Sequence, residues 1–432
     1  MTALQPAPPP PPTSRPPQAP DRSRPVRLAL LLALIALVWV LTGPSVMVMI
    51  GALVVIITLH ELGHYLTAKW SGMKVTEFFL GFGPRIWSFR RGETEYGLKA
   101  IPAGAYVKII GLNNLEEIDP ADEARTYRQQ SYPKRMLVIL AGSGMHFVIC
   151  LALIFTLLVG WGAPGGRLFA SADDVDPSTW EVGTVADDSA ADLAGVRPGD
   201  RVLSVDGEPV VTFADLGSVV SALAGEPVEV VVERGGEELA IHTTIQARED
   251  GSGLLGVTGT LPRERSNPIE AVPATLADFG RIMTESVKAT AQLLSPSGIS
   301  SFAGQVADGN GDDGDRAAAP ATSEEEASRP MSVVGATRFG AQALESGVDN
   351  FLYVLIVLNA FIGLFNLIPL LPLDGGHAAI GTYERIREGR SGKRYFVDVT
   401  RLLPLTYAVV MGLVILGVSA AYLDVVNPPN IP

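Results

Sequence analysis

The sequence predicts an α-helical polytopic membrane protein with an inserted α+β domain and a cytoplasmic, membrane-associated β-hairpin region. Of its 432 residues, 47% are hydrophobic and 18% are charged, and the mean hydropathy of +0.27 is too high for an ordinary soluble enzyme. Apolar stretches close to the ~20 residues that cross a bilayer recur along the chain. Between them lie segments in which apolar and polar residues alternate, the pattern of β-strands. The net charge of −13 and the lack of a basic patch argue against a nucleic-acid partner.

The N-terminal part is predicted to be a tail followed by a helical hairpin. Residues 1–26 are rich in proline and are expected to be disordered. An extra membrane helix at 27–44 has an apolar core that is short for a span. That core also has the length of a signal peptide's apolar region, but no small-residue cleavage site ends it. Gly43 and Pro44 separate it from the next apolar stretch, Val46 to Ala68.

Three further apolar stretches, 136–161, 351–373 and 402–423, complete the predicted spans. Basic residues cluster after the second and the fourth of the five stretches, so both loops are expected to be cytoplasmic and 162–350 extracytoplasmic. These basic residues are Lys69, Lys74, Arg85, Arg90, Arg91, Lys99 and Lys108 in the first loop, and Arg385, Arg387, Arg390, Lys393, Arg394 and Arg401 in the second.

The loop after the second stretch alternates apolar and polar residues with glycine breaks from Phe78 to Val107, which predicts strands joined by turns. Its apolar side is expected to enter the membrane, where its edge would accept an extended peptide. A small cytosolic hairpin is the alternative. This region belongs to the first part of the membrane core, 45–161, and 331–425 form the second part.

The extracytoplasmic region contains a compact α+β domain at 180–259. Strands are expected at Val182–Val185, Arg201–Val205, Val228–Glu233 and Glu238–Ile245, and helices at Ala190–Ala194 and Phe213–Ala222. Amphipathic helices are expected at 260–306, and the acidic, Gly- and Ala-rich residues 307–330 are expected to be a disordered linker.

The motif His60-Glu61-Leu62-Gly63-His64 lies inside the second apolar stretch. On a helix the two histidines leave the same face and bind one Zn²⁺, and Glu61 is placed to take a proton from water. Ionisable groups inside a membrane are costly and usually functional, which disfavours two ordinary histidines and a solvated glutamate. The single cysteine, Cys150, excludes disulfides and cysteine-based zinc sites within the chain.

A catalytic zinc needs a third protein ligand, and Asp374 is the best candidate. It lies at the cytoplasmic end of the fourth apolar stretch, so it is expected at the same depth in the membrane as His60 and His64. Pro369 and Pro372 prevent a regular helix before it, which frees the backbone and lets Asp374 turn inward. The alternative is an ordinary loop aspartate at a helix end.

These motifs together resemble the site-2 protease family of intramembrane zinc metalloproteases, in particular the bacterial, actinobacterial and mycobacterial-type members that carry a PDZ domain and cut anti-sigma factors. The similarity covers about residues 46–425. It rests on the zinc motif, on Gly81-Phe82-Gly83-Pro84, on the PDZ-like run from Ala190 to Gly207, on Ser332-Val333-Val334-Gly335, on Asn366 to His377, and on the ending Leu402 to Tyr407.

The resemblance implies Zn²⁺ bound by His60, His64 and Asp374, with Glu61 as the general base. It implies that Asn366 holds the substrate backbone or the oxyanion. Gly81 and Gly83 are predicted to contact substrate at the strand edge. The expected partners are membrane lipids and single-pass membrane proteins such as anti-sigma factors. The expected location is the plasma membrane, with the PDZ domain outside and the active site near the cytoplasmic leaflet.

One departure from the family pattern occurs near the start of the third stretch. The family usually has Ala-Gly-Pro and a following Asn, whereas this chain has Ala141-Gly142-Ser143-Gly144-Met145-His146. His146 is a candidate to support a metal ligand by a hydrogen bond, to reach the metal, or to be a core histidine without a special role. His377 is expected to be a loop residue near the site.

Two other functions compete with proteolysis. An inactive membrane scaffold with a PDZ domain would not need to keep the carboxylate of Glu61 within an apolar helix. A transporter with intramembrane acids would be expected to show inverted repeats, which the sequence lacks. Whether the PDZ domain grips a peptide or excludes bulky substrates is left open by the sequence.

Overall fold

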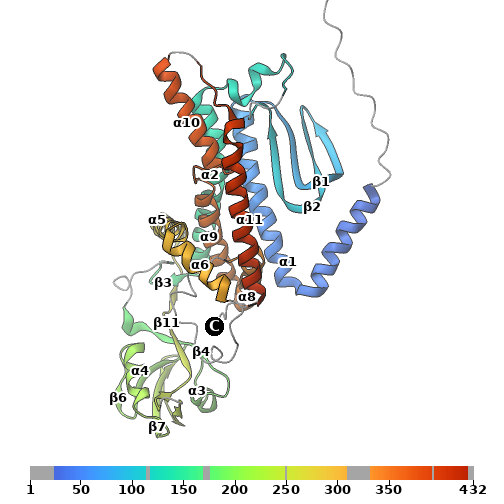
Figure 1. Cartoon of the computed structure of the whole chain (residues 1–432). Helices are drawn as coiled ribbons and strands as arrows, with labels where there is room; N and C mark the ends of the chain where they lie inside the picture. Colours follow the sequence, from blue (N-terminus) through green and yellow to red (C-terminus); the bar gives the residue numbers. More distant parts are fainter. Residues whose placement is uncertain are drawn as a thin grey trace, which may run out of the picture. The chain divides into compact units, whose positions relative to one another are not determined.

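The computed structural model describes residues 24–112, 117–168, 176–248, 251–308, 331–391 and 394–426 (Figure 1). The chain divides into two compact units. One contains Met1–Gly142 and His377–Tyr407, and the other contains Ser143–Gly376 and Ala408–Pro432. The predicted linker at 307–330 and the predicted tail at 1–26 lie almost wholly outside the described residues.

Helix α1 (Arg24–Trp70) of the first unit is interrupted at Gly43, whose φ of 81° and ψ of 177° are not helical. The expected break between the first two apolar stretches is therefore present, and α1 changes direction there (Figure 1). The helix starts at Arg24, so residues 24–26 are helical and do not belong to a disordered tail. Pro25 permits this because proline is tolerated in the first turn of a helix.

Strands β1 (Val75–Arg91) and β2 (Thr94–Ile109) follow as an antiparallel hairpin with several register shifts. This hairpin coincides with the strands expected between Phe78 and Val107. Short 3-10 helices at Glu123–Arg125 and Tyr127–Gln129 lead to α2 (Tyr132–Gly160). The core of this unit joins the end of α1, the hairpin and the start of α2 through Ala68, Met73, Val75, Ile109, Tyr127, Val138 and Ile139.

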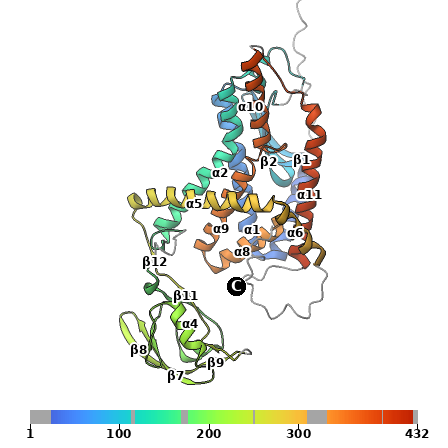
Figure 2. The ribbon, with the colours of Figure 1, turned by 60° about the vertical axis from the view of Figure 1, so that its left-hand side comes forward.

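In the second unit the rest of α2 packs with α9 (Val348–Phe365) and α5 (Pro268–Leu293) around buried Cys150, Ile154, Leu157, Leu158, Ile282 and Ile356. Helix α5 lies across the other two (Figure 2). Helices α6 (Pro296–Asp308) and α8 (Val333–Ser346) also belong here. Helix α9 ends at Phe365, and residues 366–373 form turns and bends around Pro369 and Pro372, as expected from these prolines.

The α+β domain of this unit contains a four-stranded sheet in the order β6-β5-β7-β8. Its strands are β5 (Arg201–Val205), β6 (Glu208–Pro209), β7 (Pro227–Arg234) and β8 (Glu237–Thr244). Strand β4 (Glu181–Val185) pairs with β11 (Val257–Thr260), and the helices are α3 (Ala190–Ala194) and α4 (Phe213–Ser221). The bounds of the four expected strands and two expected helices differ from the expected ones by one residue at most, whereas β6 and β11 were not expected. Shorter strands are β3 (Ala163–Pro164), β9 (Gln246–Ala247), β10 (Gly253–Leu254) and β12 (Arg263–Glu264).

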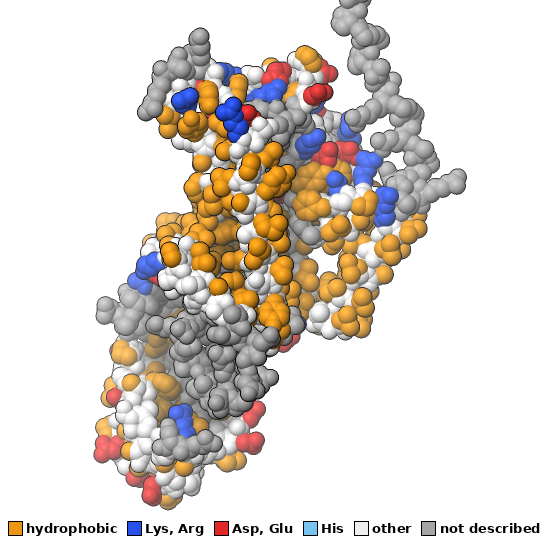
Figure 3. Space-filling model, viewed as in Figure 1, with side chains coloured by type: hydrophobic (Ala, Val, Ile, Leu, Met, Phe, Trp, Pro, Cys, Tyr) orange, Lys and Arg blue, Asp and Glu red, His pale blue; other side chains and the backbone are white. Residues whose placement is uncertain are grey.

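Helix α10 (Asp374–Ser391) and helix α11 (Leu403–Val426) complete the described chain. Among the described residues, four helical segments are long and apolar enough to cross a membrane: Pro25–Trp70, Tyr132–Gly160, Val348–Phe365 and Val399–Asp424. The first of them contains both of the first two apolar stretches. Hydrophobic side chains cover the visible faces of the long helices (Figure 3). A polytopic membrane protein is the architecture that these helices suggest.

Candidate metal centre

Helix α1 places His60 and His64 one turn apart on the same face. Their Nε2 atoms lie 3.2 Å apart, and the side chains are nearly buried, with 9% and 7% of the residues exposed. Two nitrogens bound to a tetrahedral zinc at about 2.0 Å lie about 3.3 Å from each other. The spacing of these two atoms therefore fits a shared zinc ion.

A backbone carbonyl orients His64. Its Nδ1 lies 2.7 Å from the carbonyl oxygen of Val138 on α2, which can only accept a hydrogen bond. The proton therefore belongs on Nδ1, and Nε2 presents its lone pair on the side of His60. This is the arrangement by which metal-binding histidines are usually held.

Two glycines allow α1 and the start of α2 to approach each other here. A Cβ atom on Gly142 would lie 2.4 Å from His64 Nε2 and 2.5 Å from His60 Cε1. A Cβ atom on Gly63 would lie 2.5 Å from the carbonyl oxygen of Ala141. Small residues at such positions let helix backbones pack closely. The close packing of α1 against α2 therefore explains why both Gly63 and Gly142 are glycines.

Glu61 lies on the neighbouring side of α1 and contacts the β-hairpin. The backbone N–H of Val107 donates to Glu61 Oε2 at 3.1 Å. This hydrogen bond fixes the orientation of the carboxylate.

Asp374 is the first residue of α10 and is held by the backbone around it. The N–H of Gly375 donates to the carbonyl oxygen of Asn366 at 2.7 Å, so the turn that starts after α9 closes on the start of α10. A Cβ atom on Gly375 would lie 2.2 Å from the Leu367 carbonyl oxygen. Only glycine fits this close approach.

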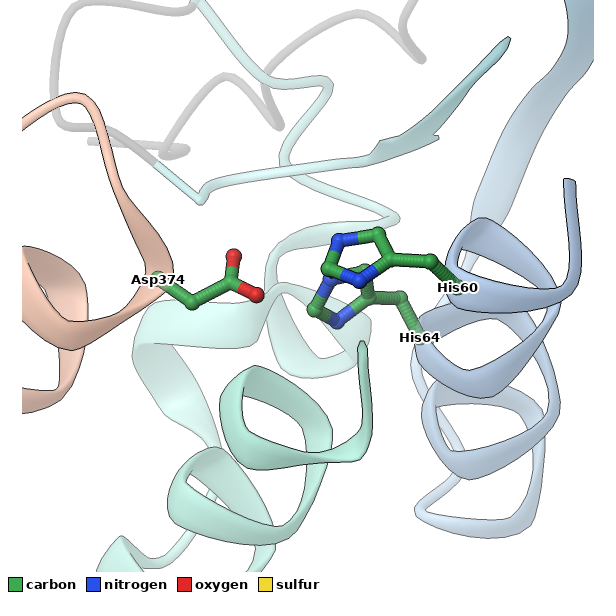
Figure 4. A group of neighbouring side chains, drawn as sticks. All are labelled: His60, His64 and Asp374. Carbon is green, nitrogen blue, oxygen red and sulfur yellow. The ribbon is translucent and has the colours of Figure 1, made fainter. Parts of the chain in front are cut away.

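The ligand-type atoms of His60, His64 and Asp374 all lie within 4.8 Å of one another (Figure 4). Figure 4 shows the carboxylate of Asp374 pointing toward the two imidazoles. Two imidazoles and one carboxylate are a common catalytic donor set for zinc, and they leave a fourth position for water or substrate. The donor chemistry of these residues therefore fits a catalytic zinc ion.

The other candidate residues have different positions. Asn366 is the C-cap of α9 and is partly buried. Gly81 and Gly83 lie in β1 with φ values of 85° and 80°, where the register of the hairpin shifts. His377 lies in the first turn of α10 and not in a loop, so that expectation was wrong. Pro369 and Pro372 break the helix before Asp374, but a new helix starts directly after these residues.

His146 is buried on α2 and makes a hydrogen bond with Asn359, which was not among the residues expected at the site. Its Nδ1 lies 3.0 Å from Asn359 Oδ1, and Asn359 Nδ2 donates to the carbonyl oxygen of Leu355 at 2.8 Å. Both side chains are almost fully buried. Asn359 is a polar amide within an apolar stretch, which was the available signal.

Known proteins resemble this chain over most of its length. Residues 48–411 match the model of peptidase family M50. The chain is 36% identical over 410 residues to the zinc metalloprotease Rip1 of Mycobacterium tuberculosis, which covers 87% of this chain and 96% of that protein. It is 35% identical over 421 residues to Rip1 of Mycolicibacterium smegmatis, with 90% and 99% covered.

Among solved structures, a PDZ domain of the SdrC-like protein from Listeria monocytogenes matches 19% of this chain and 88% of that domain. The identity is 19% and the TM-score is 0.18, which is too low to assign a fold. The match to the family model and the two relatives that align over most of the chain are sufficient to assign the family. The chain belongs to peptidase family M50, the site-2 protease family, and is a zinc metalloendopeptidase.

Proposed function

We propose that this protein hydrolyses a peptide bond within or near the transmembrane helix of a single-pass membrane protein. The observation that carries the proposal is the group of His60, His64 and Asp374, whose ligand-type atoms lie within 4.8 Å of one another. The two histidines belong to a helix apolar and long enough to span a membrane. A protease site on such a helix acts on substrates at the same depth.

In this proposal His60, His64 and Asp374 hold the zinc ion, and Glu61 is the general base. When bound, Zn²⁺ supplies Lewis acidity that favours attack on a carbonyl carbon and stabilises the negative charge that develops. Glu61 is adjacent to a ligand in sequence, and its carboxylate is oriented by the Val107 N–H. It takes a proton from the attacking water and delivers it to the leaving amine.

The substrate must be extended before its backbone is attacked, because a transmembrane helix satisfies its peptide groups internally. The hairpin of β1 and β2 offers strand edges for an extended segment, and the shifts near Gly81 and Gly83 interrupt its own pairing. Asn366 lies at the end of α9, eight residues before Asp374. We assign it to contact with the substrate backbone or the oxyanion.

The natural substrates under this proposal are single-pass proteins such as anti-sigma factors, cut after a first extracytoplasmic cleavage. The domain at 180–259 is then a PDZ domain outside the cell, and the metal centre lies near the cytoplasmic leaflet. If this domain excludes bulky substrates, its deletion will allow cleavage of an untrimmed substrate. If it captures peptides, the deletion will not do so.

The decisive experiment uses the full-length protein in lipid vesicles with a single-pass substrate. We expect Glu61→Gln to reduce cleavage at least ~100-fold while zinc content stays near one per chain, because the ligands remain. Glu226→Gln, at an exposed site in the α+β domain, is the matched control with the same loss of charge. His60→Ala is expected to lose both zinc and cleavage.

Near-normal cleavage by Glu61→Gln would contradict the general-base role. An inactive scaffold predicts instead that the wild type binds its partners without cutting them, and that both glutamate variants behave alike. Membrane proteomics of cells with wild type or Glu61→Gln identifies the substrate as a trimmed single-pass protein that accumulates only in the variant.

A further inference from the structure

A cavity of about 510 Å³ lies at the start of α2 in the first unit, and none of the residues proposed for catalysis lines it. Ser131, Tyr132 and Pro133 line it at the helix end. Its remaining lining is dominated by guanidinium groups, which come from the segment before α2, from α2 itself, from α10 and from the residues after α10. These are Arg128, Arg135, Arg385 and Arg394, with Glu388 as the acidic member.

Two of the four guanidinium groups are already neutralised. Arg128 Nη2 lies 2.5 Å from Glu123 Oε2, and Arg128 Nε donates to Glu123 Oε1 at 2.9 Å. Arg135 Nη2 lies 2.5 Å from Glu384 Oε2. Arg128 and Arg135 thus line the cavity without adding to its net charge.

The other two guanidinium groups are less well compensated. Arg394 donates to the side-chain and backbone oxygens of Gln129, which are neutral. Arg385 Nη1 lies 3.9 Å from Glu388 Oε2, and its side chain is 61% exposed. Four arginines therefore face three carboxylates, and one positive charge remains. A phosphodiester carries a single negative charge and matches this excess.

The buried side of the cavity is lined by Arg135. Arg135 is 8% exposed, and its Nε is buried with no hydrogen-bond partner among the described residues. The first turn of the 29-residue helix α2 adds the positive end of the helix dipole. Guanidinium forks and a helix N-terminus together are a common way to hold a phosphate group.

The position of the cavity in the chain indicates the source of the phosphate. Helix α2 is a candidate membrane span that begins at Tyr132, so its start is expected at a membrane surface. Tyrosine is typical of that boundary, and basic residues favour the cytoplasmic side, where anionic lipids attract them. We propose that this cavity binds the phosphodiester headgroup of an anionic phospholipid.

The experiment compares two double variants that lose the same charge. Arg385→Gln with Arg394→Gln removes the two less compensated arginines and leaves the Arg128 and Arg135 ion pairs in place. Arg387→Gln with Arg401→Gln is the control, because Arg387 lies over the rings of Tyr383 and Tyr395 and Arg401 pairs with Asp398. Neither control residue lines the cavity.

Full-length proteins are exposed to mixtures of phosphatidylglycerol and phosphatidylcholine, and the retained lipids are counted by native mass spectrometry. We expect the wild type and the control to prefer phosphatidylglycerol, and the cavity variant to lose about tenfold or more of that preference. Thermal unfolding and zinc content, measured on all three, are expected to agree and show that the variants are folded.

Equal preference in the cavity variant and the wild type would overturn the proposal, as would an equal loss in the control. Two competitors distinguish other ligands of the same chemistry. If inorganic phosphate or an acidic peptide displaces phosphatidylglycerol at comparable concentration, the cavity is not a lipid site. Displacement by short-chain phosphatidylglycerol alone supports it.

Discussion

The segments that carry the histidines and Asp374 position their side chains in different ways. His60 and His64 belong to a regular helix, and their spacing follows from the helical repeat alone. Asp374 follows eight residues without regular helix, and its place depends on the turn closed by the Gly375 N–H and the Asn366 carbonyl. The first arrangement depends on the regular repeat of a helix, and the second depends on the path of an irregular backbone.

This difference determines which changes each segment tolerates. A displaced imidazole can return toward the metal by changing its rotamer, although His64 must then keep or replace its hydrogen bond to the Val138 carbonyl. A backbone that is pushed away from the Leu367 carbonyl carries Asp374 with it, and no rotamer change restores the position. We therefore expect the Asp374 segment to be the more sensitive to added atoms.

Gly375→Ala is expected to have the largest effect. The new Cβ would lie 2.2 to 2.4 Å from three backbone atoms of Leu367 and Ile368, which cannot yield as a side chain can. A shift of about 1 Å in a catalytic group lowers activity by about 100-fold. Cleavage kinetics in vesicles measure this loss.

Gly389→Ala is the control for this change. Gly389 lies on the same helix as Gly375, and no atom lies within 4 Å of the position its added Cβ would take. It is expected to cut normally. Normal cleavage by Gly375→Ala would show that the turn is not what positions Asp374.

Gly142→Ala is expected to have a smaller effect, on zinc binding. The added methyl group would lie 2.4 Å from His64 Nε2, so the imidazole or the helix must move. Displacing a ligand or its support typically weakens zinc binding by about 10- to 100-fold. Zinc affinity measured by competition with a chelator tests this.

Gly144→Ala, two residues later on α2, has open space around its Cβ and serves as the control. If both alanines leave zinc affinity unchanged, the close approach of α2 to the zinc motif is not needed for metal binding. If Gly142→Ala loses activity at full zinc occupancy, the contact serves catalysis and not affinity.

The same difference between the segments explains what the sequence could predict. The histidine pair was evident because its signal is local, four residues apart within an apolar helix. The strands of the hairpin and of the α+β domain were evident from their alternation and from glycine turns such as Gly235-Gly236. Pro369 and Pro372 correctly indicated irregular backbone before Asp374.

Other features of the candidate site were not evident from the sequence. The Val138 carbonyl and the Val107 N–H are backbone groups, and every residue has such groups. The start of α10 at Asp374 was missed because its Gly375-Gly376 pair predicts a turn more than a helix. The role of Gly142 required knowing which helix packs on the histidines.

The smallest effect is expected at His146, whose role the sequence left undecided. Its hydrogen bond to Asn359 joins α2 to α9 inside an apolar region. His146→Leu removes the partner of Asn359 Oδ1 and should lower the free energy of unfolding by about 1–3 kcal/mol. Zinc affinity should stay at the wild-type value, since His146 is not in the group formed by His60, His64 and Asp374.

The double variant His146→Leu with Asn359→Leu should recover part of the lost stability, because replacing both partners leaves no buried polar atom of that pair unsatisfied. Denaturant unfolding and zinc titration on all three variants separate the two roles. A loss of zinc affinity in His146→Leu at unchanged stability would assign this histidine to the metal centre. The metal centre would then also depend on a residue of α2, besides the histidines of α1 and the irregular backbone before Asp374.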